Sequence, residues 1–239
     1  MIWPRNVAPE ILDHLPPNDP VVVQCRRDLR LINTLTGNAR TVADALAQHS
    51  PQAPRMLVDF GAGDGTFMLR VAQRLAPRWQ NITVVLLDRQ GYVEDETREA
   101  FAALKWNVEA VKADLFDYLE QMNAARGAVM TANLFVHHFE RPQLERLFAH
   151  VARSASLFVA CEPRRSMIMA RLSAWLWVAG CHDVTVQDAK SSVRAGFRNG
   201  ELSDAWSNAW PRGDEWQLHE KTVWPFSQCF VARRRATAV

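Results

Sequence analysis

An aspartate followed by three closely spaced glycines is the most informative chemical feature of the sequence. The segment Val58–Phe67 follows a short apolar run and begins a helical pattern, which is the context in which a glycine loop can hold a ligand. Glycines let the backbone approach a ligand without a Cβ in the way. The residues concerned are Asp59, Gly61, Gly63 and Gly65.

The spacing of this loop disfavours one class of ligand and favours another. Dinucleotides are bound by G-x-G-x-x-G, and the third of those glycines would stand at Thr66. The carboxylate of Asp64 would lie beside the pyrophosphate and repel it. The loop therefore favours a ligand that carries a cation and no phosphate, such as S-adenosylmethionine (SAM), over NAD or FAD.

Three further polar side chains stand at the ends of predicted strands. Asp88 ends the apolar run that begins at Ile82, and a carboxylate there can accept hydrogen bonds from both hydroxyls of a ribose. Asp114 follows the predicted strand Val108–Val111, and Asn133 follows the predicted strand Ala128–Ala132. Ligands of open α/β sheets bind at the carboxyl ends of the strands, so we expect these side chains to share one site.

With its glycine loop and these polar residues in this order, the sequence resembles the class I (Rossmann-like) SAM-dependent methyltransferases of the small-molecule type. The resemblance covers about residues 55–165. It implies that SAM is the cofactor, that Asp114 binds the adenine amino group and that the next residues pack on the adenine ring. The cofactor-binding residues that it implies are Asp59, Gly61, Gly63, Gly65, Asp88, Arg89, Asp114, Leu115 and Asn133.

Two adjacent histidines, His137 and His138, follow the fourth predicted strand and are the candidate catalytic residues. If the acceptor of the methyl group is a phenol, a base must take its proton, and histidine suits neutral pH. Neighbouring side chains diverge, so we expect one histidine to face the acceptor and the other the core. The alternative is that one of them is a hydrogen-bonded packing residue. No metal ligand is predicted, because no further His or Asp cluster completes a site.

Weaker signals concern the substrate. Arg164 and Arg165 follow the fifth predicted strand, at the edge where ligands bind. Trp206 is one of several tryptophans in the last third of the chain that could form a wall for a flat acceptor, although core packing or a dimer face explains them equally well.

Apolar runs alternate with helical patterns from residue 56 onward, which predicts βαβ units and a parallel sheet. The expected fold is therefore α/β: a Rossmann-like, seven-stranded, mostly parallel sheet with helices on both faces and an antiparallel strand near the C-terminus. Residues 1–50 are predicted as an N-terminal extended segment and helical cap with a break at Gly37, and residues 51–239 as the SAM-binding domain.

The last part of the chain is harder to divide into elements. Ser166–Ala179 is predicted as one helix that stops at Gly180. Asp183–Val193 and Thr222–Val231 are predicted as the last two strands, and the segment between them as a folded excursion near a functional mouth.

Composition narrows the classes of function. The 239 residues carry 28 basic and 26 acidic side chains, so no strongly basic surface for nucleic acid is expected. The four cysteines are far apart and are expected to be buried free thiols in a reducing cytoplasm. No apolar run is long enough to span a membrane, and the N-terminus is not that of a signal peptide. A homodimer is left open.

We therefore expect SAM-dependent methyl transfer to a small organic acceptor, at the oxygen of an aromatic or quinone-like metabolite. Asn133 is followed by Leu134 and Phe135 rather than by prolines, so the motif of amino-directed nucleic-acid methyltransferases is absent. The alternatives are C- or N-methylation of a similar ring, or a SAM-binding regulatory protein without catalysis.

Overall fold

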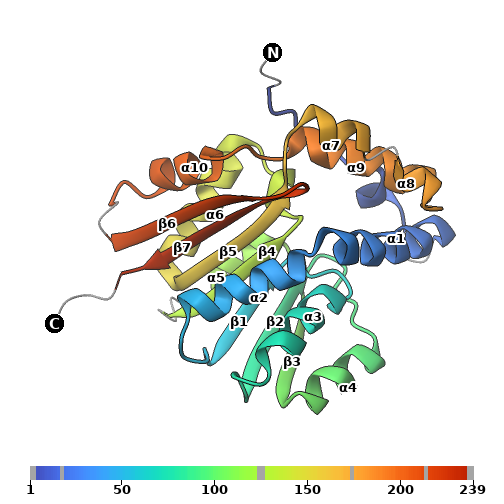
Figure 1. Ribbon diagram of the computed structural model, residues 1–239. Helices are drawn as coiled ribbons and strands as arrows, with labels where there is room; N and C mark the ends of the chain where they lie inside the picture. Colours follow the sequence, from blue (N-terminus) through green and yellow to red (C-terminus); the bar gives the residue numbers. More distant parts are fainter. Residues whose placement is uncertain (1–3, 17–18, 123–126, 173–174, 213–214, 236–239) are drawn as a thin grey trace.

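A seven-stranded sheet forms the centre of the computed structural model, which describes residues 4–16, 19–122, 127–172, 175–212 and 215–235 (Figure 1). The strand order is β3-β2-β1-β4-β5-β7-β6, and only β7 runs antiparallel to its neighbours, β5 and β6. The strands are β1 (Met56–Phe60), β2 (Ile82–Asp88), β3 (Trp106–Lys112), β4 (Ala128–Asn133), β5 (Ala155–Pro163), β6 (Trp216–Val223) and β7 (Ser227–Arg234). The predicted fold class is confirmed.

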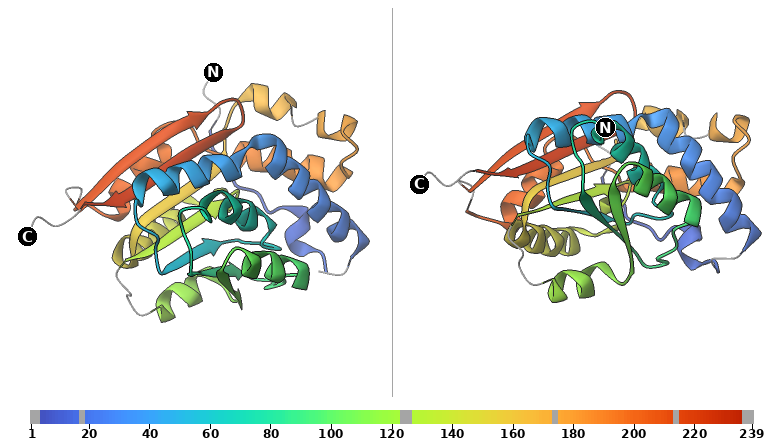
Figure 2. Two further views of the ribbon diagram at one scale, coloured as in Figure 1. Left: turned by 60° about the horizontal axis from the view of Figure 1, so that its bottom comes forward. Right: turned by 90° about the horizontal axis from the view of Figure 1, so that it is seen from below.

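Helices cover both faces of the sheet, as the two views of Figure 2 also show. They begin and end as follows: η1 (Ile11–His14), α1 (Pro20–Thr36), α2 (Asn38–His49), α3 (Thr66–Leu75), α4 (Asp95–Ala103), α5 (Leu115–Gln121), η2 (Val136–His138), α6 (Arg141–Ser154), α7 (Met167–Leu172), α8 (Trp175–Val178), α9 (Asp183–Ala195) and α10 (Glu201–Ala209). Among the described residues, no helix is both long and apolar enough to cross a membrane.

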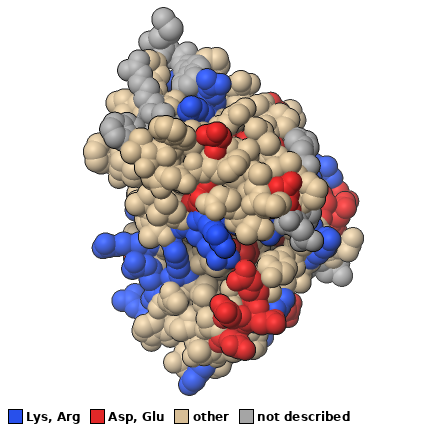
Figure 3. All heavy atoms as spheres, turned by 90° about the vertical axis from the view of Figure 1, so that its right-hand side faces the viewer, with Lys and Arg blue, Asp and Glu red and all other residues tan. Residues whose placement is uncertain are grey.

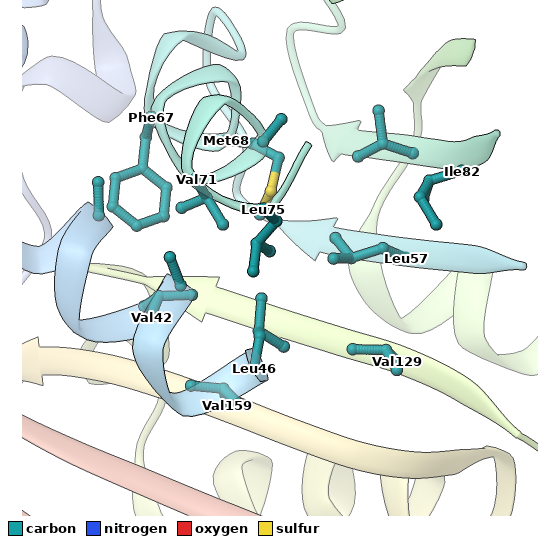
Figure 4. Close-up of a cluster of buried hydrophobic side chains, with 14 of the residues drawn as sticks. Val42, Leu46, Leu57, Phe67, Met68, Val71, Leu75, Ile82, Val129 and Val159 are labelled. Carbon is teal, nitrogen blue, oxygen red and sulfur yellow. The ribbon is translucent and has the colours of Figure 1, made fainter. Parts of the chain in front are cut away.

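The central strands are apolar on both faces, and each face buries its own core. On one face, side chains of α2 and α3 pack onto β1, β2, β4 and β5; Figure 4 shows Leu46 of α2 between Leu75 of α3 and Val159 of the sheet. On the other face, α6 and α10 enclose an aromatic cluster that includes Phe148, Phe158, Trp206 and Phe230. A two-sided core of this kind explains why the strands are continuous apolar runs.

The N-terminal region divides at Gly37, as predicted. Gly37 has a φ of 69°, which ends α1 and begins α2 with a change of direction. Helix α2 belongs to the main core, whereas α1 packs against α9. Asp28 of α1 is 5% exposed and accepts hydrogen bonds from the backbone N–H of His182 and the hydroxyl of Thr185, both at 2.8 Å.

The prediction for the end of the chain needs three corrections. Asp183–Val193 is not a strand but most of helix α9, whose N-cap His182 accepts the N–H of Val184 at 3.2 Å. The segment before β7 contains helix α10 and strand β6. The predicted helix Ser166–Ala179 is two helices, α7 and α8, with residues 173–174 between them outside the described part.

Candidate active site

The glycine loop joins β1 to α3, and all three of its glycines have a positive φ: 65° at Gly61, 57° at Gly63 and 78° at Gly65. A Cβ on Gly61 would lie 2.2 Å from Cδ2 of Phe135, so the turn after β4 is packed directly on this loop. Around Gly63, by contrast, a Cβ would find nothing within 4 Å. The loop is therefore tight on the protein side and open on the side where a ligand can approach.

Asp88 is placed at the end of β2 so that its carboxylate lies beside the loop. One oxygen accepts the backbone N–H of Gly63 at 3.0 Å, and the other accepts the N–H of Gln90 at 2.8 Å. These bonds hold the carboxylate in one orientation and leave each oxygen able to accept a further hydrogen bond, as two ribose hydroxyls would require.

Asp59 is buried under the loop and is 2% exposed. Burial raises the pKa of its carboxyl to about 7; the hydrogen bond from the Thr131 hydroxyl, at 2.7 Å, works in the opposite direction, and the charge of Asp88 adds to the rise. Asp59 therefore changes its charge near neutral pH, in a place where a cationic ligand would favour the ionised form.

Asp114 has two roles at once. It is the N-cap of α5, since its side chain accepts the N–H of Phe116 at 2.8 Å. It also pairs with Arg89 at 2.7 Å, and this hydrogen bond lowers the pKa of the carboxyl. Both residues line the cleft described below, with Leu115.

Asn133 is the centre of a polar network that the sequence did not reveal. Its side-chain amide donates to Oδ1 of Asn33 on α1, and its Oδ1 accepts from Asn38 of α2, both at 2.9 Å. The hydroxyl of Ser227, at the start of β7, donates to Asn38 at 2.7 Å. The network ties both N-terminal helices to the end of β4. No local signal marks it, because its members are distant in sequence.

The N-terminal helix also reaches the glycine loop directly. Arg30 donates to Asp64 at 2.6 Å, while the other oxygen of Asp64 accepts the N–H and hydroxyl of Thr66. On the face of the molecule that carries α1, α8 and α4, basic and acidic side chains form adjacent groups (Figure 3).

A cleft of about 1140 Å³ runs along this edge of the sheet. Its cofactor half is lined by the glycine loop, the ends of β2, β3 and β4, and α1; its other half is lined by the N-terminal segment, the turn after β4, and α7–α9. Every residue of the implied cofactor set except Gly65 lines the cleft. An open glycine loop and a fixed carboxylate at Asp88 fit the adenosine and amino-acid parts of SAM.

The two histidines lie side by side, with His137 buried and His138 half-buried. Both line the cleft, and their ring centroids are 4.3 Å apart. His137 is 2% exposed, and its Nδ1 lies 2.7 Å from Glu162 of β5, whose carboxylate also accepts three backbone N–H groups of the turn. Its Nε2 lies 3.6 Å from Glu10, an ion-pair distance.

These carboxylates decide the charge of His137. Burial alone would lower its pKa, but the attraction of Glu10 and Glu162 outweighs burial and raises the pKa to about 9. His137 is therefore an imidazolium at neutral pH. Glu10, Glu162 and Arg5 were missed by sequence reasoning; Arg5 donates to the carbonyls of His137 and Phe139, both at 2.8 Å, and fixes the turn from outside.

The three weak substrate candidates lie elsewhere, and their assignment to the substrate is corrected. Trp206 is 1% exposed and packs against Phe148 with ring centroids 5.3 Å apart, inside the core. Arg165 is buried and donates to the carbonyl of Gly196 at 2.6 Å. With Arg164 it borders a separate, smaller hollow of about 470 Å³ beside α7.

Comparison with known proteins agrees with this geometry. Residues 57–156 match the family model of a methyltransferase domain. No curated protein matches the chain.

Three solved structures illustrate the likeness. The plantazolicin methyltransferase BamL, in complex with a triazolic desmethylPZN analog and SAH, is 12% identical with a TM-score of 0.63, over 94% of this chain and 93% of that one. An O-methyltransferase family protein from Burkholderia thailandensis is 14% identical with a TM-score of 0.57, over 93% and 64%. A Nostoc punctiforme protein described as an O-methyltransferase is 14% identical with a TM-score of 0.54, over 88% and 59%.

The chain thus spans less than two thirds of the two O-methyltransferase structures and nearly all of BamL. At these identities the likeness establishes the fold. The family model, which covers less than half of the chain, adds that residues 57–156 resemble a methyltransferase domain, in agreement with the predicted resemblance to class I SAM-dependent methyltransferases.

Proposed function

We propose that the chain transfers the methyl group of SAM to a hydroxyl oxygen of a small aromatic or quinone-like acceptor. The observation that carries this proposal is the placement of His138 in the wall of the cleft, against an imidazolium that two carboxylates hold in place. Bound SAM supplies an electrophilic methyl group on its sulfonium.

His138 is the residue that we assign as general base. His137 already holds its protons at neutral pH, because its pKa is about 9, so it cannot accept another. The ring of His138 lies against it and is only half-buried. As the carbon–oxygen bond forms and the carbon–sulfur bond breaks, the hydroxyl proton passes to His138 and the thioether product leaves.

The rest of the turn positions the acceptor. Phe135 and Phe139 meet edge to face, with ring centroids 5.3 Å apart, and both line the cleft. Leu12, Met169 and Phe226 extend this apolar lining. An apolar wall beside a base favours a flat, largely apolar acceptor that presents one hydroxyl, and it excludes water from the reacting atoms.

The test compares two acceptors in His138→Gln and in a control, His150→Gln, whose histidine lies on α6 and outside the cleft lining. With a phenol that is un-ionised at the assay pH, His138→Gln should lose about 10²–10⁴ in turnover, because general-base catalysis is lost. With a phenol that is already ionised, the variant should keep most of its activity. The affinity of the variant for the demethylated cofactor, S-adenosylhomocysteine (SAH), should stay within a few fold of the wild-type value.

Other results would favour the alternatives. Equal loss with both phenols would refute a base role for His138. Turnover only with nitrogen or carbon acceptors would replace O-methylation by N- or C-methylation. SAM binding without turnover of any acceptor would favour a regulatory protein.

A cytoplasmic location belongs to the same proposal and is supported by the four cysteines, which are buried free thiols as predicted. A homodimer remains a prediction for light scattering.

A further inference from the structure

A compact cluster of titratable side chains lies beside the proposed base, and the methyl-transfer step uses only one of its members, His138. The cluster consists of Glu10, His137 and His138. Glu10 comes from the N-terminal segment, and the histidines come from the turn after β4. One nitrogen or carboxylate oxygen of each lies within 4.8 Å of the other two. The side chain of Glu10 is 14% exposed and that of His137 is 3% exposed, so the cluster is set into the wall of the cleft.

His137 is held as a metal ligand would be. Its Nδ1 points at Glu162, which is fully buried and fixed by the backbone N–H groups of residues 135–137. Its Nε2 is buried and has no hydrogen-bond partner within the described part of the chain. Histidines that bind metals almost always direct their second nitrogen to a carboxylate or carbonyl, which sets the tautomer and the ring orientation.

The distances suit a small divalent ion. Zinc binds histidine nitrogens and carboxylate oxygens at about 2.0–2.2 Å in a tetrahedral arrangement, which places neighbouring ligand atoms about 3.3–3.6 Å apart. Nε2 of His137 and Oε1 of Glu10 are 3.6 Å apart. The hydroxyl of Ser192 donates to the same Glu10 oxygen and orients the carboxylate toward the cluster.

We propose that Glu10, His137 and His138 bind a zinc-type ion, with the fourth position open to the cleft. The ion displaces the proton on Nε2 of His137 into solvent and occupies a ring nitrogen of His138. Bound zinc therefore inhibits methyl transfer to an un-ionised hydroxyl. This inhibition rests on the proposed role of His138, whereas the binding of the ion does not.

The binding test uses untagged, metal-free protein titrated with Co²⁺ and Zn²⁺. Calorimetry counts the ions, and the visible absorption of Co²⁺ reports nitrogen and oxygen ligation. We expect one ion per chain, and weakening by at least about tenfold in Glu10→Gln and His138→Gln. The control is His219→Gln, since His49 and His219 form another close ring pair, with centroids 5.0 Å apart. This variant should bind the ion as the wild type does.

Two results would overturn the site: unchanged Zn²⁺ affinity in a folded His138→Gln protein, or binding that is lost in His219→Gln instead. The activity arm separates the two proposals. Zinc that binds and slows the transfer, with recovery in EDTA, supports both. Zinc that binds at the cluster without slowing the transfer supports the metal site and refutes His138 as the base.

Discussion

The affinity for the cofactor should rise with pH, because Asp59 must give up a proton for the ligand to bind well. Its pKa of about 7 in the ligand-free protein comes mainly from burial. The ammonium group of S-adenosylhomocysteine (SAH) brings a positive charge into the cleft that Asp59 lines. An opposite charge favours the ionised carboxylate, so binding and ionisation should be coupled.

The size of the effect follows from that pKa. If only the ionised form binds, the apparent Kd scales with the inverse of the ionised fraction, which is about one tenth at pH 6 and about nine tenths at pH 8. The Kd for SAH should therefore fall about tenfold between these pH values. At pH 6, close to one proton should be released for each ligand bound.

Calorimetry in two buffers of different ionisation enthalpy measures both quantities. Asp59→Asn removes the titrating group, so its Kd should vary little with pH, and any dependence that remains belongs to the ligand. Thr131→Val removes the hydroxyl that lowers the pKa of Asp59, so the profile should move to higher pH. Thr131→Ser keeps a hydroxyl and should resemble the wild type.

A wild-type Kd that changes less than twofold from pH 6 to pH 8, or a tenfold change that persists in Asp59→Asn, would refute this coupling. Stability gives a second check. The folded pKa lies above the ordinary value of 3.8, so the native state binds more protons between about pH 4 and pH 7. The ligand-free protein should therefore lose stability as pH rises through this window, by up to about 4 kcal/mol, and Asp59→Asn should not.

Three further results are expected. Asp88→Ala should weaken SAH binding roughly ten- to a hundredfold in a melting-temperature or calorimetric assay, since it removes charge-assisted hydrogen bonds of about 1.5–3 kcal/mol; an unchanged Kd in a folded variant would contradict the ribose assignment. A left-handed backbone costs an alanine about 1–2 kcal/mol. Gly61→Ala should lower the free energy of unfolding in urea by more than this, because the new Cβ would also lie 2.2 Å from Phe135, whereas Gly63→Ala, with open space around it, should cost less. Methyl transfer should survive EDTA, because His138 takes the proton without a metal; a complete loss that magnesium restores would reverse this.

Features that depend on local pattern could be predicted from the order of the residues. The glycine loop is recognisable because its φ angles of 57–78° suit glycine and few other residues. The buried strands are recognisable because side chains packed on both faces require unbroken apolar runs. Asp88 and Asn133 could be placed at one edge because parallel strands bring their carboxyl ends together.

The residues that meet in the acceptor half of the cleft could not be predicted, because the three-dimensional fold brings them together from distant segments. Glu10 and Glu162 reach His137 from segments distant in sequence, and they turn an expected base into a fixed cation. Asp183–Val193 is a helix whose long-range contacts are polar: Asp188 accepts the N–H groups of Ile11 and Leu12 in η1, and Thr185 donates to Asp28 of α1. Trp206 lies in the core because it packs against aromatic side chains of β5 and β7. Burial and ion pairing depend on partners that the fold brings together, and no local pattern encodes them.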